Sequence, residues 1–188
     1  MRLTVKTLIV AGVIALVAAP RPAHAEGFFG PWIGAAFSQG PDFREANSKT
    51  AFGGFLGSMG GGGIWGFDID FGYTPNFFAD SSVVDNNLFT VTGNVIVGPS
   101  IESSGGRGVR PYGAFGVGLI HSKVESTSDN KFGWDGAGGL MAFFSSNIGI
   151  RGDLRYFHSV NDSDAASTIL LKPGSFHYWR GYVGLVIR

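Results

Sequence analysis

Large apolar side chains alternate with small or charged ones along several stretches of the chain. Between residues 64 and 73, the five odd positions are aromatic or Ile, while the even positions include two aspartates and two glycines. Because successive side chains of a β-strand point to opposite faces, this alternation predicts strands with one bulky face. The pattern of residues 49–57 does not define its faces. We expect eight strands, at about residues 28–38, 49–57, 64–73, 87–98, 110–122, 132–143, 148–158 and 176–187.

Short strands at even spacing are typical of a sandwich or a barrel. A soluble sandwich would bury its bulky faces and expose its polar ones, but the other faces here are mostly Gly, Ala and Ser. Bulky faces directed at lipid, around a narrow interior of small and charged residues, explain the pattern better. We therefore predict an all-β fold, an eight-stranded antiparallel transmembrane β-barrel.

Seven charged residues fall on the faces that this fold directs inward. Buried charges need partners, so we interpret these residues as a network that fills the lumen. An ion or proton path is the alternative. The predicted lumen charge network comprises Asp68, Asp70, Asp135, Arg151, Asp153, Arg155 and Arg180.

Aromatic residues gather near the ends of the predicted strands, where a membrane protein meets the boundary between lipid and water. The middle positions are more often aliphatic or Gly. The alternative is the ordinary aromatic content of a sheet. The predicted aromatic girdles comprise Trp65, Tyr73, Phe132, Trp134, Phe143, Phe144 and Trp179.

The first 25 residues have the features of a secretory signal peptide. Arg2 and Lys6 precede the apolar run 8–19, and Ala23-His24-Ala25 is a cleavage motif. The run of twelve residues is too short for a transmembrane helix. We expect residues 1–25 to be cleaved and residues 26–188 to form one outer-membrane barrel domain.

Composition narrows the function classes. The chain has 31 Gly, 17 Phe and no Cys, which suits an all-β protein and excludes disulfide scaffolds and thiolate metal sites. Its net charge of zero gives no sign of a nucleic-acid partner. An exported chain without cysteine fits a bacterial envelope.

Three stretches, at residues 66–73, 110–119 and 148–157, resemble the small outer-membrane β-barrel family that includes the OmpA transmembrane domain and OmpX. The resemblance covers the whole chain after residue 25. It implies both termini in the periplasm, long outer loops, short inner turns and insertion by the barrel-assembly machinery. Members usually end on an aromatic residue, whereas Val183, Leu185 and Ile187 keep the outward register and Arg188 follows.

These features predict a non-enzymatic integral protein of the cell outer membrane. Its expected partners are membrane lipid and lipopolysaccharide. The barrel is expected to support envelope integrity, and polar loops at residues 39–48, 74–86, 124–131 and 159–175 are expected to serve adhesion or recognition of an extracellular ligand. No cofactor or metal is expected, because arginines are simpler partners for Asp68 and Asp70. The alternatives are a lipid A-modifying enzyme that uses His158 and Ser159, and a soluble periplasmic lipocalin-like binder. Adjacent side chains face opposite sides of a strand, which disfavours the enzyme.

Overall fold

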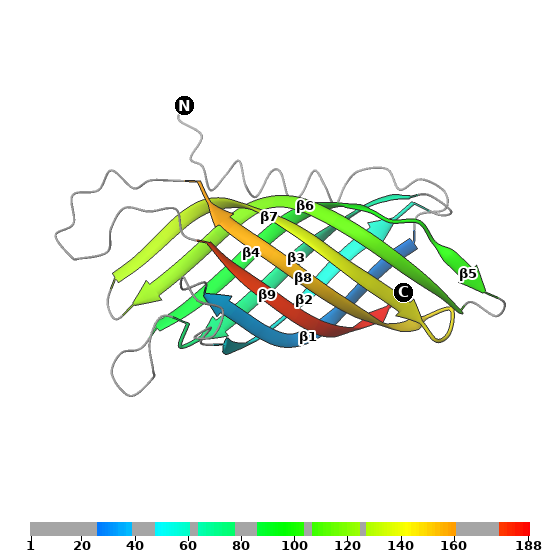
Figure 1. Cartoon of the computed structure of the whole chain (residues 1–188), viewed down its shortest axis with the longest axis horizontal. Helices are drawn as coiled ribbons and strands as arrows, with labels where there is room; N and C mark the ends of the chain where they lie inside the picture. Colours follow the sequence, from blue (N-terminus) through cyan, green and yellow to red (C-terminus); the bar gives the residue numbers. More distant parts are fainter. Residues whose placement is uncertain are drawn as a thin grey trace, which may run out of the picture.

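The strands wind around a closed barrel, and each is antiparallel to its neighbours (Figure 1). The computed structural model describes residues 26–38, 48–60, 64–77, 86–103, 107–124, 127–160 and 177–188. The predicted signal peptide lies outside the described residues. The strands in this part of the chain are β1 (Glu26–Ser38), β2 (Ser48–Met59), β3 (Trp65–Pro75), β4 (Asn86–Val97), β5 (Ile101–Ser103), β6 (Arg107–Val124), β7 (Thr127–Phe143), β8 (Ile148–Ser159) and β9 (His177–Ile187). Among the described residues, no helix is long and apolar enough to span a membrane.

Two pairings close the barrel. β1 is hydrogen-bonded to both β2 and β9, and β4 is paired with β6 rather than ending the sheet. The ring therefore contains eight strands, with β5 as a short addition. The predicted fold and the eight predicted segments are confirmed.

The bulky faces point outward. Phe115 at mid-wall is 61% exposed, and Phe29 and Val183 are also exposed. Asp68 and Asp70, on the other face of β3, are buried. The soluble lipocalin-like alternative is wrong, because it requires the aromatic faces to form an internal core.

The structure also defines the faces of β2, which its sequence does not. Ala51 and Phe55 point into the barrel, whereas Phe52 and Leu56 are exposed outside. Gly53 and Gly57 lie between the inward side chains, so this face is only weakly apolar in the sequence.

The long connection after β4 forms a hairpin that continues the wall. Val97 is paired with Gly113, and Ile101 is paired with Val109. Each pair member is displaced by four residues, forward into β5 and backward in β6, so the register of the antiparallel pair does not change. In this register Pro99 stands opposite Pro111, and neither proline has an N–H to donate to the ladder. β5 is thus an extension of β4, interrupted at the two prolines. Figure 1 shows β5 at the same end of the barrel as the C-terminus.

At the opposite end, β6 and β7 extend further than the sequence predicts. The sequence predicts a loop at residues 124–131, but Thr127 is paired with Val124 and the β7 strand runs on from there. This prediction is wrong because a strand that leaves the membrane can be polar on both faces. Most residues of the other expected loops, 39–48, 74–86 and 159–175, lie outside the described residues.

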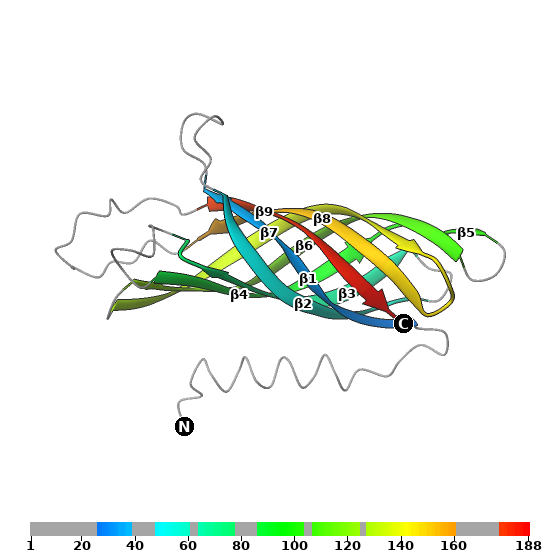
Figure 2. The same ribbon diagram turned by 90° about the horizontal axis from the view of Figure 1, so that it is seen from below.

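The two ends of the folded chain meet at one end of the barrel (Figure 2). The Arg188 guanidinium lies 3.4 Å from the Glu26 carboxylate and 3.5 Å from the centre of the Phe143 ring. The backbone N–H of Arg188 donates to the carbonyl of Asn147. Ile187, next to Arg188, points outward, in the register that the sequence predicts.

Candidate functional site

Three arginines lie at the centre of the barrel, and their side chains are 0–1% exposed. Arg151 and Arg155 come from β8, and Arg180 comes from β9. A guanidinium buried in this way is stable only when acceptors surround it. The structure places all seven predicted lumen charges inside the barrel, and every carboxylate among them contacts an arginine.

The Arg151 side chain reaches across the lumen from β8 to β3. Its Nη1 donates to Asp68 Oδ2 across the barrel at 2.7 Å, and its Nη2 donates to Asp153 Oδ2 at 3.1 Å. Tyr112 joins the pair, since its hydroxyl accepts from Arg151 Nε and donates to Asp153, both at 2.6 Å. Asn94 donates to the second oxygen of Asp68 at 2.7 Å.

Arg155 lies two inward positions further along β8, with Asp153 between it and Arg151. Its Nη1 donates to Asp135 Oδ2 on β7 at 2.8 Å and to Thr92 Oγ1 on β4 at 3.3 Å. Its Nη2 and Nε reach the two oxygens of Asp153, each at 3.4 Å. Asp153 therefore bridges Arg151 and Arg155, and joins their contacts into one network.

Arg180 pairs with Asp70 across the barrel and donates to Thr90 Oγ1 at 3.1 Å. Its guanidinium also lies over three aromatic rings, 4.5 Å from the centre of Trp32, 4.8 Å from that of Phe157 and 5.6 Å from that of Tyr182. Such contacts add electrostatic attraction when both groups are shielded from water. Arg180 is thus held by a carboxylate, a hydroxyl and three ring faces.

The interior is more aromatic than the sequence predicts. The expected inward faces are mainly small and charged, but large rings share the lumen with the arginines. The strict alternation within each strand already placed them there. The buried aromatic residues on inward positions are Phe28, Trp32, Phe55, Tyr112, Phe157, Tyr178 and Tyr182.

Glycines on the neighbouring strands make room for these rings. Trp32 is paired directly with Gly53, and Tyr112 with Gly139. A Cβ built on either glycine would collide with the ring opposite. The glycines that seemed to leave the inward faces empty therefore accommodate side chains from the adjacent strands.

Apolar layers lie beyond the charged centre at both ends. Ile96, Met141 and Val186, at the end that holds the chain termini, are completely buried. Leu88 and Ile120 are buried toward the other end, with the stacked rings of Phe157 and Tyr178. The ionic network thus lies between two apolar layers.

Arg110 is a buried residue that the sequence interpretation missed. It lies on β6, two residues before Tyr112, and is 2% exposed. The even positions of β6 point inward, as Ala114 and Gly116 do, so the register contained the necessary signal. With Arg110, four arginines balance the four buried aspartates among the described residues.

The predicted girdle residues do not all lie on the outer surface. Trp65 and Phe144 are exposed near the end that holds the chain termini, and Phe132 is exposed near the other end. Tyr73, Trp134 and Trp179 are half-buried on outward positions. Phe143 is only 6% exposed, so assigning it to a girdle is wrong. It occupies an inward position of β7, and Arg188 covers its ring.

His158 and Ser159 lie on opposite sides of the wall. The His158 ring contacts Trp134 on the outside, whereas Ser159 is buried. The two side chains therefore do not form a pair of base and nucleophile, as the alternation of the strand predicts.

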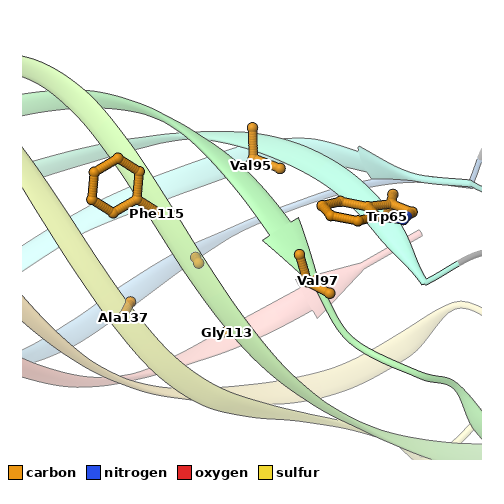
Figure 3. Close-up of a pocket in the computed structure, with 7 residues that line it drawn as sticks. Trp65, Val95, Val97, Gly113, Phe115 and Ala137 are labelled. Atoms are coloured by element: carbon orange, nitrogen blue, oxygen red, sulfur yellow. The ribbon is translucent and has the colours of Figure 1, made fainter.

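A shallow apolar groove crosses the outside of the wall. Trp65 on β3, Val95 and Val97 on β4, Gly113 and Phe115 on β6, and Ala137 on β7 line it (Figure 3). Its side chains are uncharged and most are exposed, which suits contact with acyl chains rather than with water.

A closed ring of tilted strands with apolar side chains outside and paired charges inside is the pattern of an outer-membrane barrel. Residues 9–176 match the model of the outer membrane protein beta-barrel domain. The chain belongs to this family. It is accordingly a protein of the cell outer membrane, as the sequence predicts.

Solved structures of other outer-membrane proteins share the fold. Neisserial surface protein A is similar over 87% of this chain and 97% of its own, with a TM-score of 0.62 and 14% identity. OprG from Pseudomonas aeruginosa is similar over 88% and 95%, with a TM-score of 0.55 and 12% identity. Ail, the attachment invasion locus protein of Yersinia pestis, is similar over 87% and 97%, with a TM-score of 0.50 and 18% identity. No curated protein matches the chain.

Proposed function

We propose that this family member is a non-enzymatic structural barrel whose lumen is filled by side chains. The observation that carries the proposal is the near-complete burial of Arg151, Arg155 and Arg180 at the centre of the barrel. Each arginine is held by an aspartate from another part of the wall or from its own strand. A continuous aqueous path would leave these groups wet.

The network also supports a mechanical role. Its contacts join β8 to β3, β4, β6 and β7, and β9 to β3 and β4. Cross-lumen bonds of this kind oppose both flattening and slippage of register. The proposed contribution to envelope integrity follows from such a rigid wall.

The loops opposite the chain termini are the proposed recognition surface. Binding residues are disproportionately found on loops held by a rigid scaffold. The name of Ail refers to attachment and invasion, and that protein shares this fold. We therefore include adhesion or recognition of an extracellular ligand in the proposal. Lipopolysaccharide is its proposed surrounding, and the barrel-assembly machinery its proposed partner during insertion.

Planar bilayer recording tests the filled lumen. We expect purified protein to give no stable single-channel steps. The variant Arg155→Ala with Asp135→Ala removes two central side chains and should raise the conductance, whereas Lys131→Ala at the exposed end of β7 should not. Large, stable steps from the wild type would refute the filled lumen.

A further inference from the structure

Six rings form a continuous plate on the outside of β6, β7, β8 and β9. We call this group the aromatic plate. Trp134 stacks on Phe115 with ring centres 5.9 Å apart and contacts Tyr156 at 5.7 Å. Tyr156 contacts Trp179 at 5.1 Å. The rings of the aromatic plate are Phe115, Trp134, Tyr156, His158, His177 and Trp179.

Two histidines form the edge of the plate nearest the loops. His158 is the penultimate residue of β8, and His177 is the first residue of β9. They are directly paired across the two strands, with ring centres 6.5 Å apart. His158 also lies 5.4 Å from Trp134. The imidazoles thus lie where the membrane wall meets the loops, opposite the end that holds the chain termini.

The chemistry of this edge differs from the wall below it. On the outward positions of β8 and β9, across residues 148–160 and 177–187, the other side chains are aliphatic, aromatic or absent, and none is charged. His158 and His177 are therefore the imidazoles that this surface offers to the headgroup region. His158 Nδ1 and Trp179 Nε1 are buried and have no hydrogen-bond partner in the described part of the chain, which leaves Nε2 as the His158 donor toward a headgroup.

We propose that the aromatic plate binds the phosphorylated glucosamine headgroup of an outer-leaflet glycolipid. Imidazole N–H groups donate to phosphate oxygens, and such bonds are strongest when a group is charged. Indole and phenol rings have an apolar body and a polar edge, which suits them to an interfacial headgroup. The acyl chains would continue down the exposed apolar wall at Leu154 and Val183.

The proposal depends on the membrane location of the barrel and not on the filled lumen. The ligand is a phosphorylated glycolipid, because imidazole hydrogen-bond donors and aromatic ring faces occur together where the headgroup of such a lipid would lie. A divalent cation fits less well, because no group of three metal-binding side chains occurs among the described residues.

Native mass spectrometry of the refolded full chain in detergent tests the proposal. The probes are bisphosphorylated lipid A, its dephosphorylated form and phosphatidylglycerol. We expect the wild type to retain bisphosphorylated lipid A about tenfold better than either other lipid, which corresponds to about 1.4 kcal/mol. The double variant His158→Phe with His177→Phe keeps the rings and should lose this preference.

Two further variants separate binding from folding. Tyr73→Phe, on the opposite wall beside Phe52, alters a ring pair outside the plate and should bind lipid A like the wild type. Trp179→Leu should weaken retention of both forms of lipid A. Each variant must show the heat-dependent gel shift of a closed barrel.

Three results would overturn the proposal. These are equal retention by the double histidine variant and the wild type, equal retention of phosphorylated and dephosphorylated lipid A, and loss of retention in Tyr73→Phe. If Zn²⁺ alone bound the wild type and the histidine variant lost only Zn²⁺, the site would be a metal site instead.

Discussion

The Trp32 indole lies over Gly53, its direct partner on β2, where a Cβ would come within 2.6 Å of the ring atom Cζ2. The same Cβ would collide with the backbone carbonyl oxygen of Phe71 on β3, which cannot rotate away. A single methyl group at Gly53 therefore disturbs both the lumen and the wall.

We expect Gly53→Ala to destabilise the folded barrel by about 1–3 kcal/mol, the usual cost of overpacking. Urea unfolding in lipid vesicles measures this change. Gly138→Ala is the matched control, since a Cβ at Gly138 meets nothing within 4 Å and points outward. Its effect should stay within about 0.5 kcal/mol. Similar losses in both variants would show that glycine itself, rather than the ring contact, is responsible.

Removing the guanidinium of Arg155 should leave Asp135 without its ion-pair partner in the described lumen. Breaking one member of a buried pair costs about 3–5 kcal/mol, because the remaining charge stays buried. We therefore expect Arg155→Met to be strongly destabilised in urea, and Asp135→Asn in the same chain to restore part of the loss.

An exposed ion pair provides the comparison for Arg155. Lys131 lies 3.7 Å from Asp129, and both side chains are partly exposed. Lys131→Met should change the free energy of unfolding by less than about 1 kcal/mol, because water screens such pairs. If Arg155→Met cost no more than Lys131→Met, the network would not stabilise the barrel.

The cost of a charge on the outer surface should depend on its depth. Val117 points outward from the middle of β6, whereas Ile101 is exposed on β5 beyond the prolines. Val117→Arg should cost about 2–4 kcal/mol and Ile101→Arg at most about 1 kcal/mol. Unfolding from vesicles measures both. Equal costs would mean that the two residues lie at the same depth, so that the membrane does not centre on the middle of β6.

Ser159→Ala should leave lipid A unchanged. Ser159 is buried inside the wall and His158 is outside, so the pair cannot share a proton at one substrate. Mass spectra of lipid A from cells with the wild type, with the variant and without the protein should agree. Fewer acyl chains only in cells with the wild type would restore the enzyme hypothesis.

The alternation of side chains was sufficient to predict the barrel and the inward position of charges such as Asp68 and Arg151. The predictions failed where they relied on the polarity of a residue and not on its position in the alternation. Residues 127–131 are polar, which suggests a loop, yet they pair with β6 as part of a strand. Residue type alone assigns Phe143 to the outer surface, although the inward position of Met141 already fixed its face.

The contacts inside the lumen could not be predicted from the sequence. Period two places Trp32 and Arg180 inside, but their stacking depends on the stagger between strands, which no single strand encodes. The extension of β4 by β5 depends in the same way on pairing with β6. These features became visible only when the closed barrel fixed the neighbours of each strand.

The pairing of Arg180 with Asp70 has a consequence for assembly. Arg180 lies on the last strand, 110 residues from its partner on β3. A chain that has paired every strand except β9 holds four inward aspartates but only three buried arginines among its described residues, Arg110, Arg151 and Arg155. The step that closes the hydrogen-bonded ring also cancels the surplus negative charge. An incomplete barrel would carry this charge into the membrane, which gives the last strand an electrostatic drive to dock.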